Sequence, residues 1–153
     1  MQEIVIEPAQ RKDFALATDM RAVMASEMGN NWDADHPGWR ERFALYFSER
    51  QEAGESQLFQ ARSGDEIVGM LFVSLVDDYH GYVRNKKSGR VNSVYVLPAF
   101  RRRGVARALM LAGIDWIRTK GCVVVRLNSS EDGIALYESL GFKPRREMEF
   151  SLE

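Results

Sequence analysis

The residues best suited to chemistry lie in a strand–turn–helix segment at 94–109. Val94 to Leu97 has the composition of a strand, Pro98 stops it, and an amphipathic helix follows. Between the two elements lie three arginines, Arg101 to Arg103, and then Gly104. The first N–H groups of a helix have no partner inside it, and the helix dipole places about half a positive charge there. This helix end is therefore suited to a phosphate or pyrophosphate anion.

Two plainer interpretations of the same segment stay open at this point. Three consecutive arginines also occur at solvated helix starts and in basic address signals, and a lone glycine before a helix is common. Gly104 and Ala106, however, leave room for a ligand to approach the backbone, and the guanidinium groups add positive charge at the rim. The segment lacks the Gly-Lys-Ser/Thr of a P-loop and the spaced glycines of a dinucleotide fingerprint. We expect a pyrophosphate cradle of a different kind.

The elements around this segment predict an α/β (α+β) protein. Apolar residues at helical spacing predict helices at 11–28, 37–54, 105–121 and 132–140, and runs of strand type predict strands at 4–8, 58–61, 67–76, 90–97, 122–127 and 147–152. The strand at 122–127 is apolar except for Arg126, which places it in the centre of the sheet. Residues 77–89 read as a polar loop. We predict a mixed, mostly antiparallel sheet of about six strands with helices on both faces.

Composition and charge limit the class of protein further. A chain of 153 residues suits a single domain over 1–153, and a net charge of −1 draws the protein neither to nucleic acid nor to a membrane. No apolar stretch approaches the length of a bilayer span, and the first residues do not resemble a secretory signal. One cysteine, Cys122, and two histidines make a disulfide or a structural zinc site unexpected. We expect a cytoplasmic protein without a metal.

Two short motifs resemble the signatures of the GNAT superfamily of acetyl-CoA-dependent N-acetyltransferases. The first is Arg101-x-x-Gly104-x-Ala106, preceded by a strand that ends at Pro98. The second is a helix ending in Tyr-x-x-x-Gly-Phe, from Tyr137 to Phe142. The resemblance covers residues 56 to 150, and the helical N-terminal third is compatible with it. It implies a GNAT-like acyl-CoA N-acyltransferase fold with acetyl-CoA as the acetyl donor.

The resemblance also implies which residues bind acetyl-CoA. The backbone from Arg102 to Arg107 would wrap the pyrophosphate, and the strand from Val94 to Val96 would pair with the pantetheine arm and the acetyl carbonyl. Where the family often has an asparagine, seven residues before its tyrosine, this chain has Ser130, with Asn128 two residues earlier, and both stay candidates. The expected cofactor-binding residues are Val94, Tyr95, Val96, Arg101, Arg102, Arg103, Gly104, Val105, Ala106, Arg107, Asn128, Ser130 and Tyr137.

Tyr137 is the expected catalytic acid. Attack of an amine on the thioester expels a thiolate whose conjugate acid has a pKa of about 8–9 by analogy with cysteine, and a phenol of pKa about 10 can donate a proton or hydrogen bond to it. The alternative is that the ring only packs against the sheet. The amine must also lose a proton, and no carboxylate lies in the strand at 90–97. Glu27 is the expected catalytic base, with Asp77, Asp78, a water chain or an already neutral amine as alternatives.

Trp32, Asn92 and Tyr95 are the residues expected to bind the acceptor. Residues 30–39 place Trp32 and Trp39 among turn residues, and aromatic with acidic side chains suit cationic ligands. The alternative is that these tryptophans close one end of the core. We predict direct transfer of the acetyl group to a primary amine of a small molecule, without a covalent enzyme intermediate, because the only thiol lies in an expected buried strand.

Other functions and assemblies stay open at this stage. The chain could be a non-catalytic acyl-CoA-binding sensor module, or its acceptor could be a protein N-terminus or a lysine. Nucleic-acid binding through residues 101–107 is disfavoured by the net charge. A homodimer is also left open.

Overall fold

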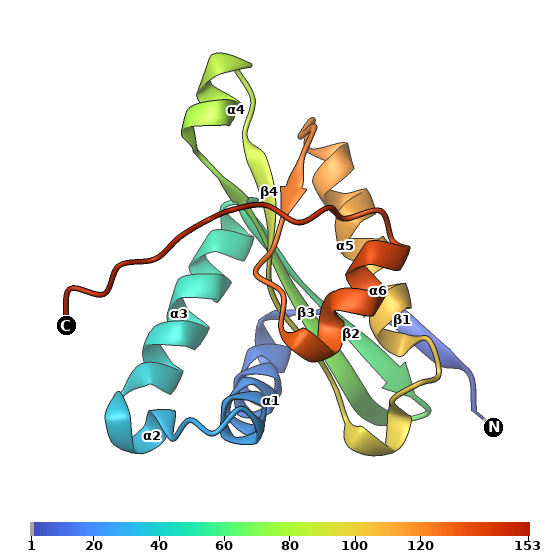
Figure 1. Ribbon diagram of the computed structural model, residues 1–153. Helices are drawn as coiled ribbons and strands as arrows, with labels where there is room; N and C mark the ends of the chain where they lie inside the picture. Colours follow the sequence, from blue (N-terminus) through green and yellow to red (C-terminus); the bar gives the residue numbers. More distant parts are fainter. Residues whose placement is uncertain (1) are drawn as a thin grey trace.

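The structure, a computed structural model, describes residues 2–153 and is built on one five-stranded sheet (Figure 1). Across the sheet lie β1 (Ile4–Pro8), β2 (Ser56–Ser63), β3 (Glu66–Val76), β4 (Ser88–Val96) and β5 (Val125–Arg126), in that order. The pairs from β1 to β4 are antiparallel, and β4 pairs with β5 in parallel. The predicted α/β class with a mixed, mostly antiparallel sheet is confirmed.

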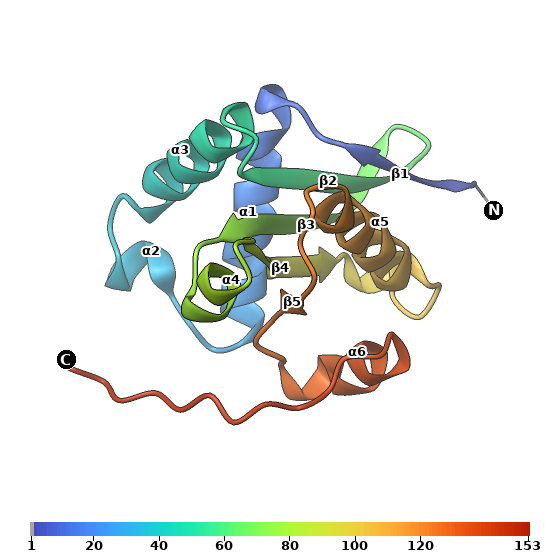
Figure 2. The same cartoon turned by 90° about the horizontal axis from the view of Figure 1, so that it is seen from above.

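Helices cover both faces of this sheet, as predicted. α1 (Phe14–Glu27) and α3 (Trp39–Glu52) pack on one face, and α5 (Val105–Thr119) packs on the other (Figures 1 and 2). The remaining helical segments are short: η1 (Arg11–Asp13), α2 (Trp32–Asp35), α4 (Tyr79–Val83), η2 (Pro98–Phe100), η3 (Glu131–Gly133) and α6 (Ile134–Ser139). No helix within residues 2–153 has both the length and the apolar composition that a membrane crossing needs.

Two apolar cores, one on each face, follow from the alternation of side chains along the strands. In β4, Val91 and Val96 point into the core beneath α5, whereas Tyr95 points into the core beneath α1 and α3. The start of α5 is fixed because Val105 is buried in the first of these cores. A buried residue at the first position of the helix holds the preceding turn in place against the sheet.

The prediction of a sixth strand at 147–152 is wrong. No strand within residues 2–153 pairs with this segment, and Met148, Phe150 and Leu152 are 93%, 85% and 92% exposed. A strand exists only through hydrogen bonds to a neighbouring strand, and an alternating sequence does not provide that neighbour. The sheet therefore has five strands.

The prediction that 122–127 forms a central strand is also wrong. Only Val125 and Arg126 pair with β4, and β5 is the edge of the sheet. Cys122, Val125 and Leu127 are partly buried against the core beneath α5. The apolar composition of this segment reflects that one-sided packing and not burial on both faces.

The expected polar loop at 77–89 contains the short helix α4. The side chain of Asp78 accepts a hydrogen bond of 2.7 Å from the N–H of Gly81, which caps the first turn of this helix. Similarly, Asn31 accepts from the N–H of Ala34 at 3.3 Å and starts α2 between the two predicted N-terminal helices. Both caps are short-range polar contacts, and the spacing of apolar residues does not predict them.

Candidate active site

The candidate site begins at the gap between β4 and β5. β4 pairs with β5 only at Gly89 and Arg90. Two residues later the register with β3 skips Asn92, so that β4 bulges at this position. A bulge bends its strand and increases its twist. From Val91 to Val96, the edge of β4 that faces β5 has no strand partner within residues 2–153, and its backbone can pair with an extended ligand.

The turn between β4 and α5 has the backbone shape of an anion site. Arg102 and Gly104 have positive φ angles of 61° and 79°, and Arg103 between them does not. Alternation of this kind turns successive N–H groups toward one side. The N–H of Ala108 donates to the carbonyl of Gly104, so the N–H groups before it precede the first helical hydrogen bond.

The space in front of this turn is open. A Cβ atom placed on Gly104 would have no heavy atom within 4 Å. Arg102 adopts a left-handed conformation that costs a non-glycine residue about 1–2 kcal/mol. Such strain is concentrated at functional sites. These residues therefore fit the pyrophosphate of an acyl-CoA through backbone N–H groups.

The side chain of Arg101 points away from this turn. Its Nε donates to the carbonyl of Val96 at 2.8 Å, and its Nη2 donates to Oε2 of Glu27 at 3.0 Å. The guanidinium also lies 5.3 Å from the ring centre of Tyr95. Arg101, which was expected to bind the cofactor, thus ties the turn to the end of β4 and to α1.

Glu27, the expected base, is held at the end of α1 by two groups. Besides Arg101, the hydroxyl of Tyr95 donates to Oε1 of Glu27 at 2.8 Å. Burial, and then this hydrogen bond, raises the pKa of the Tyr95 phenol, so that Tyr95 stays protonated and donates. The Glu27 side chain is 39% exposed and remains accessible to a ligand or to water. The fold thus brings Glu27 to Tyr95 and Arg101, which lie 68 and 74 residues away in the sequence.

Tyr137, the expected acid, lies in α6, partly buried against the core beneath α5. Its ring meets Phe142 edge-on at a centroid distance of 6.0 Å, and burial raises the pKa of its phenol. Gly133 lies one helical turn earlier, and a Cβ there would come within 2.6 Å of the Tyr137 ring. The sequence analysis did not identify Gly133, although residues four apart in a helix lie on the same face and a glycine there leaves room for the Tyr137 ring.

Asn128 and Ser130, the two candidates for the cofactor arm, have different surroundings. With its amide oxygen toward Arg90, Asn128 accepts at 3.2 Å and donates to Oε2 of Glu147 at 3.3 Å. Ser130 is exposed and precedes η3, where its carbonyl accepts from the N–H of Gly133. Sequence reasoning did not identify Arg90 or Glu147 as neighbours of this site.

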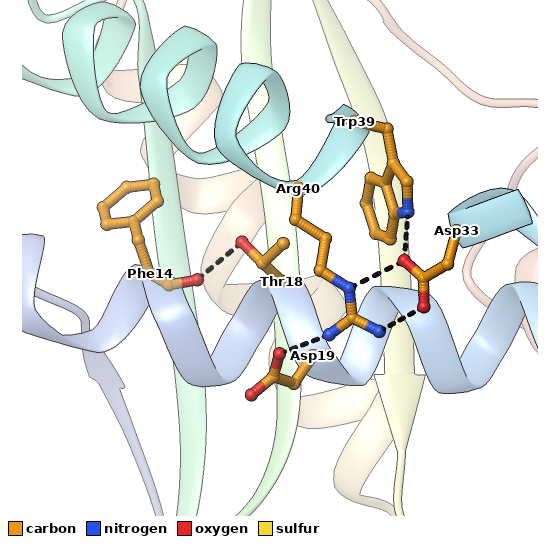
Figure 3. A network of polar contacts seen from close by, with 6 residues as sticks. All are labelled: Phe14, Thr18, Asp19, Asp33, Trp39 and Arg40. Carbon is orange, nitrogen blue, oxygen red and sulfur yellow. Dashed lines mark hydrogen bonds and ion pairs between the residues drawn. The ribbon is translucent and has the colours of Figure 1, made fainter. Parts of the chain in front are cut away.

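The segment with the two tryptophans is fixed by a polar network (Figure 3). Arg40 donates to both oxygens of Asp33, at 2.9 and 2.8 Å, and to Asp19 at 2.7 Å. The indole N–H of Trp39 donates to the same carboxylate of Asp33 at 2.9 Å. Trp39 is only 7% exposed and belongs to the packed interior.

Trp32 and Asn92, the other expected acceptor residues, lie on separate elements. Trp32 in α2 is partly buried, with its ring edge-on to Trp39 and the guanidinium of Arg21 4.3 Å from its ring centre. Asn92 lies on the β4 bulge, where its side chain accepts from the hydroxyl of Ser74 at 2.8 Å. Both side chains remain candidates for binding the acceptor, although Trp32 already contacts Arg21 and Asn92 already contacts Ser74.

Asp78, an alternative base, is engaged in structural contacts. It accepts from the N–H of Gly81 and from the Ser88 hydroxyl, and it pairs with Arg126 at 2.6 Å. The hydrogen bond from Gly81, followed by that from Ser88, lowers the pKa of Asp78. This lowered pKa makes Asp78 a poor proton acceptor.

The cradle, the open β4 edge and the Tyr137 helix fall inside one family match. The acetyltransferase (GNAT) family matches residues 25–142, and the chain belongs to this family. The match begins just before Glu27 and ends at Phe142, so it contains all the expected site residues.

Particular relatives resemble parts of the chain. It is 30% identical to a mycothiol acetyltransferase of Renibacterium salmoninarum (72% of this chain, 38% of that protein) and 38% identical to a glucosamine 6-phosphate N-acetyltransferase of Trypanosoma brucei brucei (42% and 44%). The chain thus spans less than half the length of these curated relatives. Its fold resembles a predicted acetyltransferase of Clostridium acetobutylicum solved with acetyl-CoA, with a TM-score of 0.86, 18% identity and coverage of 98% and 97%.

Proposed function

We propose that this chain is an N-acetyltransferase that moves the acetyl group of acetyl-CoA directly onto a primary amine of a small molecule. Residues 1–153 form one catalytic domain in this proposal. The observation that carries it is the combination of two features: an open turn with positive φ angles at Arg102 and Gly104 before α5, and beside it an edge of β4 that has no strand partner within residues 2–153. An anion site next to an edge that accepts an extended chain suits a ligand with a pyrophosphate and an amide-containing arm.

The backbone has three tasks in this reaction. The N–H groups of residues 102–107 bind the pyrophosphate. The edge of β4 that has no strand partner within residues 2–153, from Val91 to Val96, pairs with the amides of the pantetheine arm, beside the Val96 carbonyl that already accepts from Arg101. An N–H of the same edge polarises the acetyl carbonyl, which stabilises the charge that develops on its oxygen during attack. Acetyl-CoA supplies the activated thioester carbon at which the amine attacks.

Two side chains move the protons. As the amine nitrogen bonds to the carbonyl carbon and the carbon–sulfur bond breaks, Tyr137 donates its phenolic proton to the departing sulfur. Its raised pKa keeps that proton in place at neutral pH. Glu27 accepts the proton that the amine loses, directly or through water, while Tyr95 and Arg101 hold its carboxylate in position.

The acceptor is placed beside Glu27, between α1, α2 and the β4 bulge. In this proposal Trp32 on α2 and Asn92 on the β4 bulge contact the acceptor, and Tyr95 on β4 lines the same region. A protonated amine is attracted to the carboxylate, and an aromatic face such as that of Trp32 favours a cation. The similarity to a glucosamine 6-phosphate N-acetyltransferase supports a small acceptor molecule.

An amine panel tests this proposal. The purified chain is given acetyl-CoA with amino sugars, polyamines, amino acids or short peptides, and both free CoA thiol and acetylated product are measured. We expect thiol release that depends on a small amine. Acetylation of peptides alone would move the acceptor to a protein N-terminus or lysine. Tight acetyl-CoA binding without amine-dependent thiol release would make the chain a non-catalytic sensor.

A further inference from the structure

A positively charged side chain lies in the middle of the apolar face of α1. Buried Phe14, Ala17 and Thr18 are spaced by three or four residues, which places them on the face toward the sheet, and buried Ala25 continues this face. Arg21 follows Thr18 by three residues and precedes Ala25 by four, so it belongs to the same face. A charge taken out of water is costly unless an ion of opposite sign compensates it.

The guanidinium of Arg21 has no such compensation within residues 2–153. Its Nη1 is buried and has no hydrogen-bond partner in this part of the chain. Asp19 on α1 and Asp33 on α2 do not supply one, because both pair with Arg40, at 2.7 and 2.8 Å (Figure 3). Burial lowers the pKa of the Arg21 guanidinium, yet an arginine side chain stays protonated in proteins. The positive charge is therefore permanent and unpaired.

Trp32 holds this guanidinium in place. The guanidinium carbon lies 4.3 Å from the centre of the Trp32 ring, and this ring in turn meets buried Trp39 edge-on at a centroid distance of 5.0 Å. An arginine on an aromatic face keeps its planar set of N–H donors, which matches a carboxylate or a phosphate. Arg21 as a whole is only partly buried, so a ligand can reach these donors.

The guanidinium lies on the side of the sheet where we place the acceptor. Figure 2 shows α1 crossing the strands, with its second half on the β4 side and α2 beside it. Glu27, at the end of α1, accepts from the hydroxyl of Tyr95 on β4. At about 1.5 Å per residue, Arg21 precedes Glu27 by about 9 Å along the helix axis. An acceptor whose amine lies at Glu27 can therefore extend toward Arg21 with its other end.

We propose that Arg21 binds an oxyanion of the acceptor, so that the substrates are amines that also carry a carboxylate or a phosphate. This inference rests on the proposed function and narrows its substrate class. The oxyanion accepts hydrogen bonds from the guanidinium and compensates the charge on the buried face of α1, while the amine at the other end lies beside Glu27. Arg21 thus determines specificity and takes no part in proton transfer.

Amines matched in length test the substrate class. Acetylation is measured with ω-amino acids, aminoalkyl phosphates, amino alcohols and diamines over the same range of chain lengths. The amines with an oxyanion should exceed the amino alcohols in kcat/KM by at least tenfold, and comparison of the first two series identifies the oxyanion. Acetylation of amino alcohols or diamines at an equal or higher kcat/KM would refute the role of Arg21 and leave the acetyltransferase intact. If no amine is acetylated, the proposed function fails, and this inference with it.

Two variants of Arg21 and one control test the residue itself. Arg21→Met keeps the apolar stem and removes the charge, so the preference for the oxyanion should disappear, through a higher KM for the acidic amines. Arg21→Lys keeps a charge and should retain part of the preference. Arg118→Gln loses the same charge on α5, across the sheet, where Arg118 pairs only with Asp115, and should keep the full preference. A wild-type preference in Arg21→Met would overturn the proposal.

Thermal melts provide a measurement that does not depend on turnover. In the free protein Arg21→Met should melt no lower than the wild type, because it removes a buried charge that has no partner. A saturating acidic amine should raise the melting temperature of the wild type and of Arg118→Gln, and should leave that of Arg21→Met unchanged. If the acidic amine stabilises Arg21→Met as much as the wild type, the anion does not bind at Arg21 and the proposal is wrong.

Discussion

Gly104→Ala isolates the contribution of the turn to acetyl-CoA binding, because the same helix offers a matched control. Gly104 precedes α5 with φ +79°, and Gly121 follows it with φ +83°. At both positions an added Cβ would have no heavy atom within 4 Å, so neither methyl group clashes in the free protein. The left-handed conformation costs alanine about 1–2 kcal/mol at each site. For a chain of this size the melting temperature falls by about 2–4 °C per kcal/mol.

The two variants should be equal in stability and unequal in binding. At Gly104 the methyl group fills the space in which the pyrophosphate approaches the backbone, and we expect acetyl-CoA affinity to fall at least tenfold, about 1.4 kcal/mol. Gly121→Ala should bind as the wild type does. Calorimetric titration with acetyl-CoA and thermal melts of both variants provide the measurement. Equal affinity of the two folded variants would remove the turn from the account.

Four further outcomes follow from individual side chains. Tyr137→Phe should lower kcat and kcat/KM together by about 10²-fold, the low end for general-acid assistance, with KM unchanged. If this variant reacts at the wild-type rate while chemistry is rate-limiting, Tyr137 only lines the cofactor site. Gly133→Ala, whose Cβ would lie 2.6 Å from the Tyr137 ring, should lower kcat too, and the double variant should lose no more than Tyr137→Phe alone; additive losses would show that the two residues act independently. Trp32→Ala should raise the acceptor KM at unchanged acetyl-CoA affinity, whereas Trp39→Ala, at a buried position, should lose about 3–5 kcal/mol of stability. If Trp39→Ala raises the KM and Trp32→Ala lowers the stability, the two roles are reversed. The pKa of Asp78 is lower in the folded than in the unfolded protein, so its ionised carboxylate stabilises the fold above the unfolded pKa of about 3.9. This stabilisation is lost as pH falls through the folded pKa. Melting temperatures should therefore drop in acid, and less steeply in Asp78→Asn.

The cradle could be predicted from the sequence because it is local. Arg102, Gly104 and the first residues of α5 are adjacent in the chain, so the turn that we propose as the pyrophosphate site is made of neighbouring residues. The central strands were predictable for a similar reason, since β2, β3 and β4 follow one another and pair in sequence order.

Features that depend on distant partners could not be predicted in this way. Arg101 was assigned to the cofactor from its motif, but its side chain finds Glu27, which lies 74 residues away. No residue near Arg101 in the sequence predicts this contact with Glu27. The alternating residues at 147–152 read as a strand, and the pattern carries no information on whether a neighbouring strand exists. Side-chain direction and strand pairing are decided by tertiary contacts, which a linear pattern does not contain.

The central claim is direct transfer from acetyl-CoA to an amine, and a single-turnover experiment tests it. Excess protein is mixed with acetyl-CoA labelled in the acetyl group and with the best amine of the panel, quenched at short times, and analysed for label on the amine and on intact protein. The account predicts that label passes to the amine while the mass of the protein stays unchanged throughout. Label that appears on the protein before it reaches the amine would contradict direct attack. Label that never leaves acetyl-CoA would contradict catalysis itself.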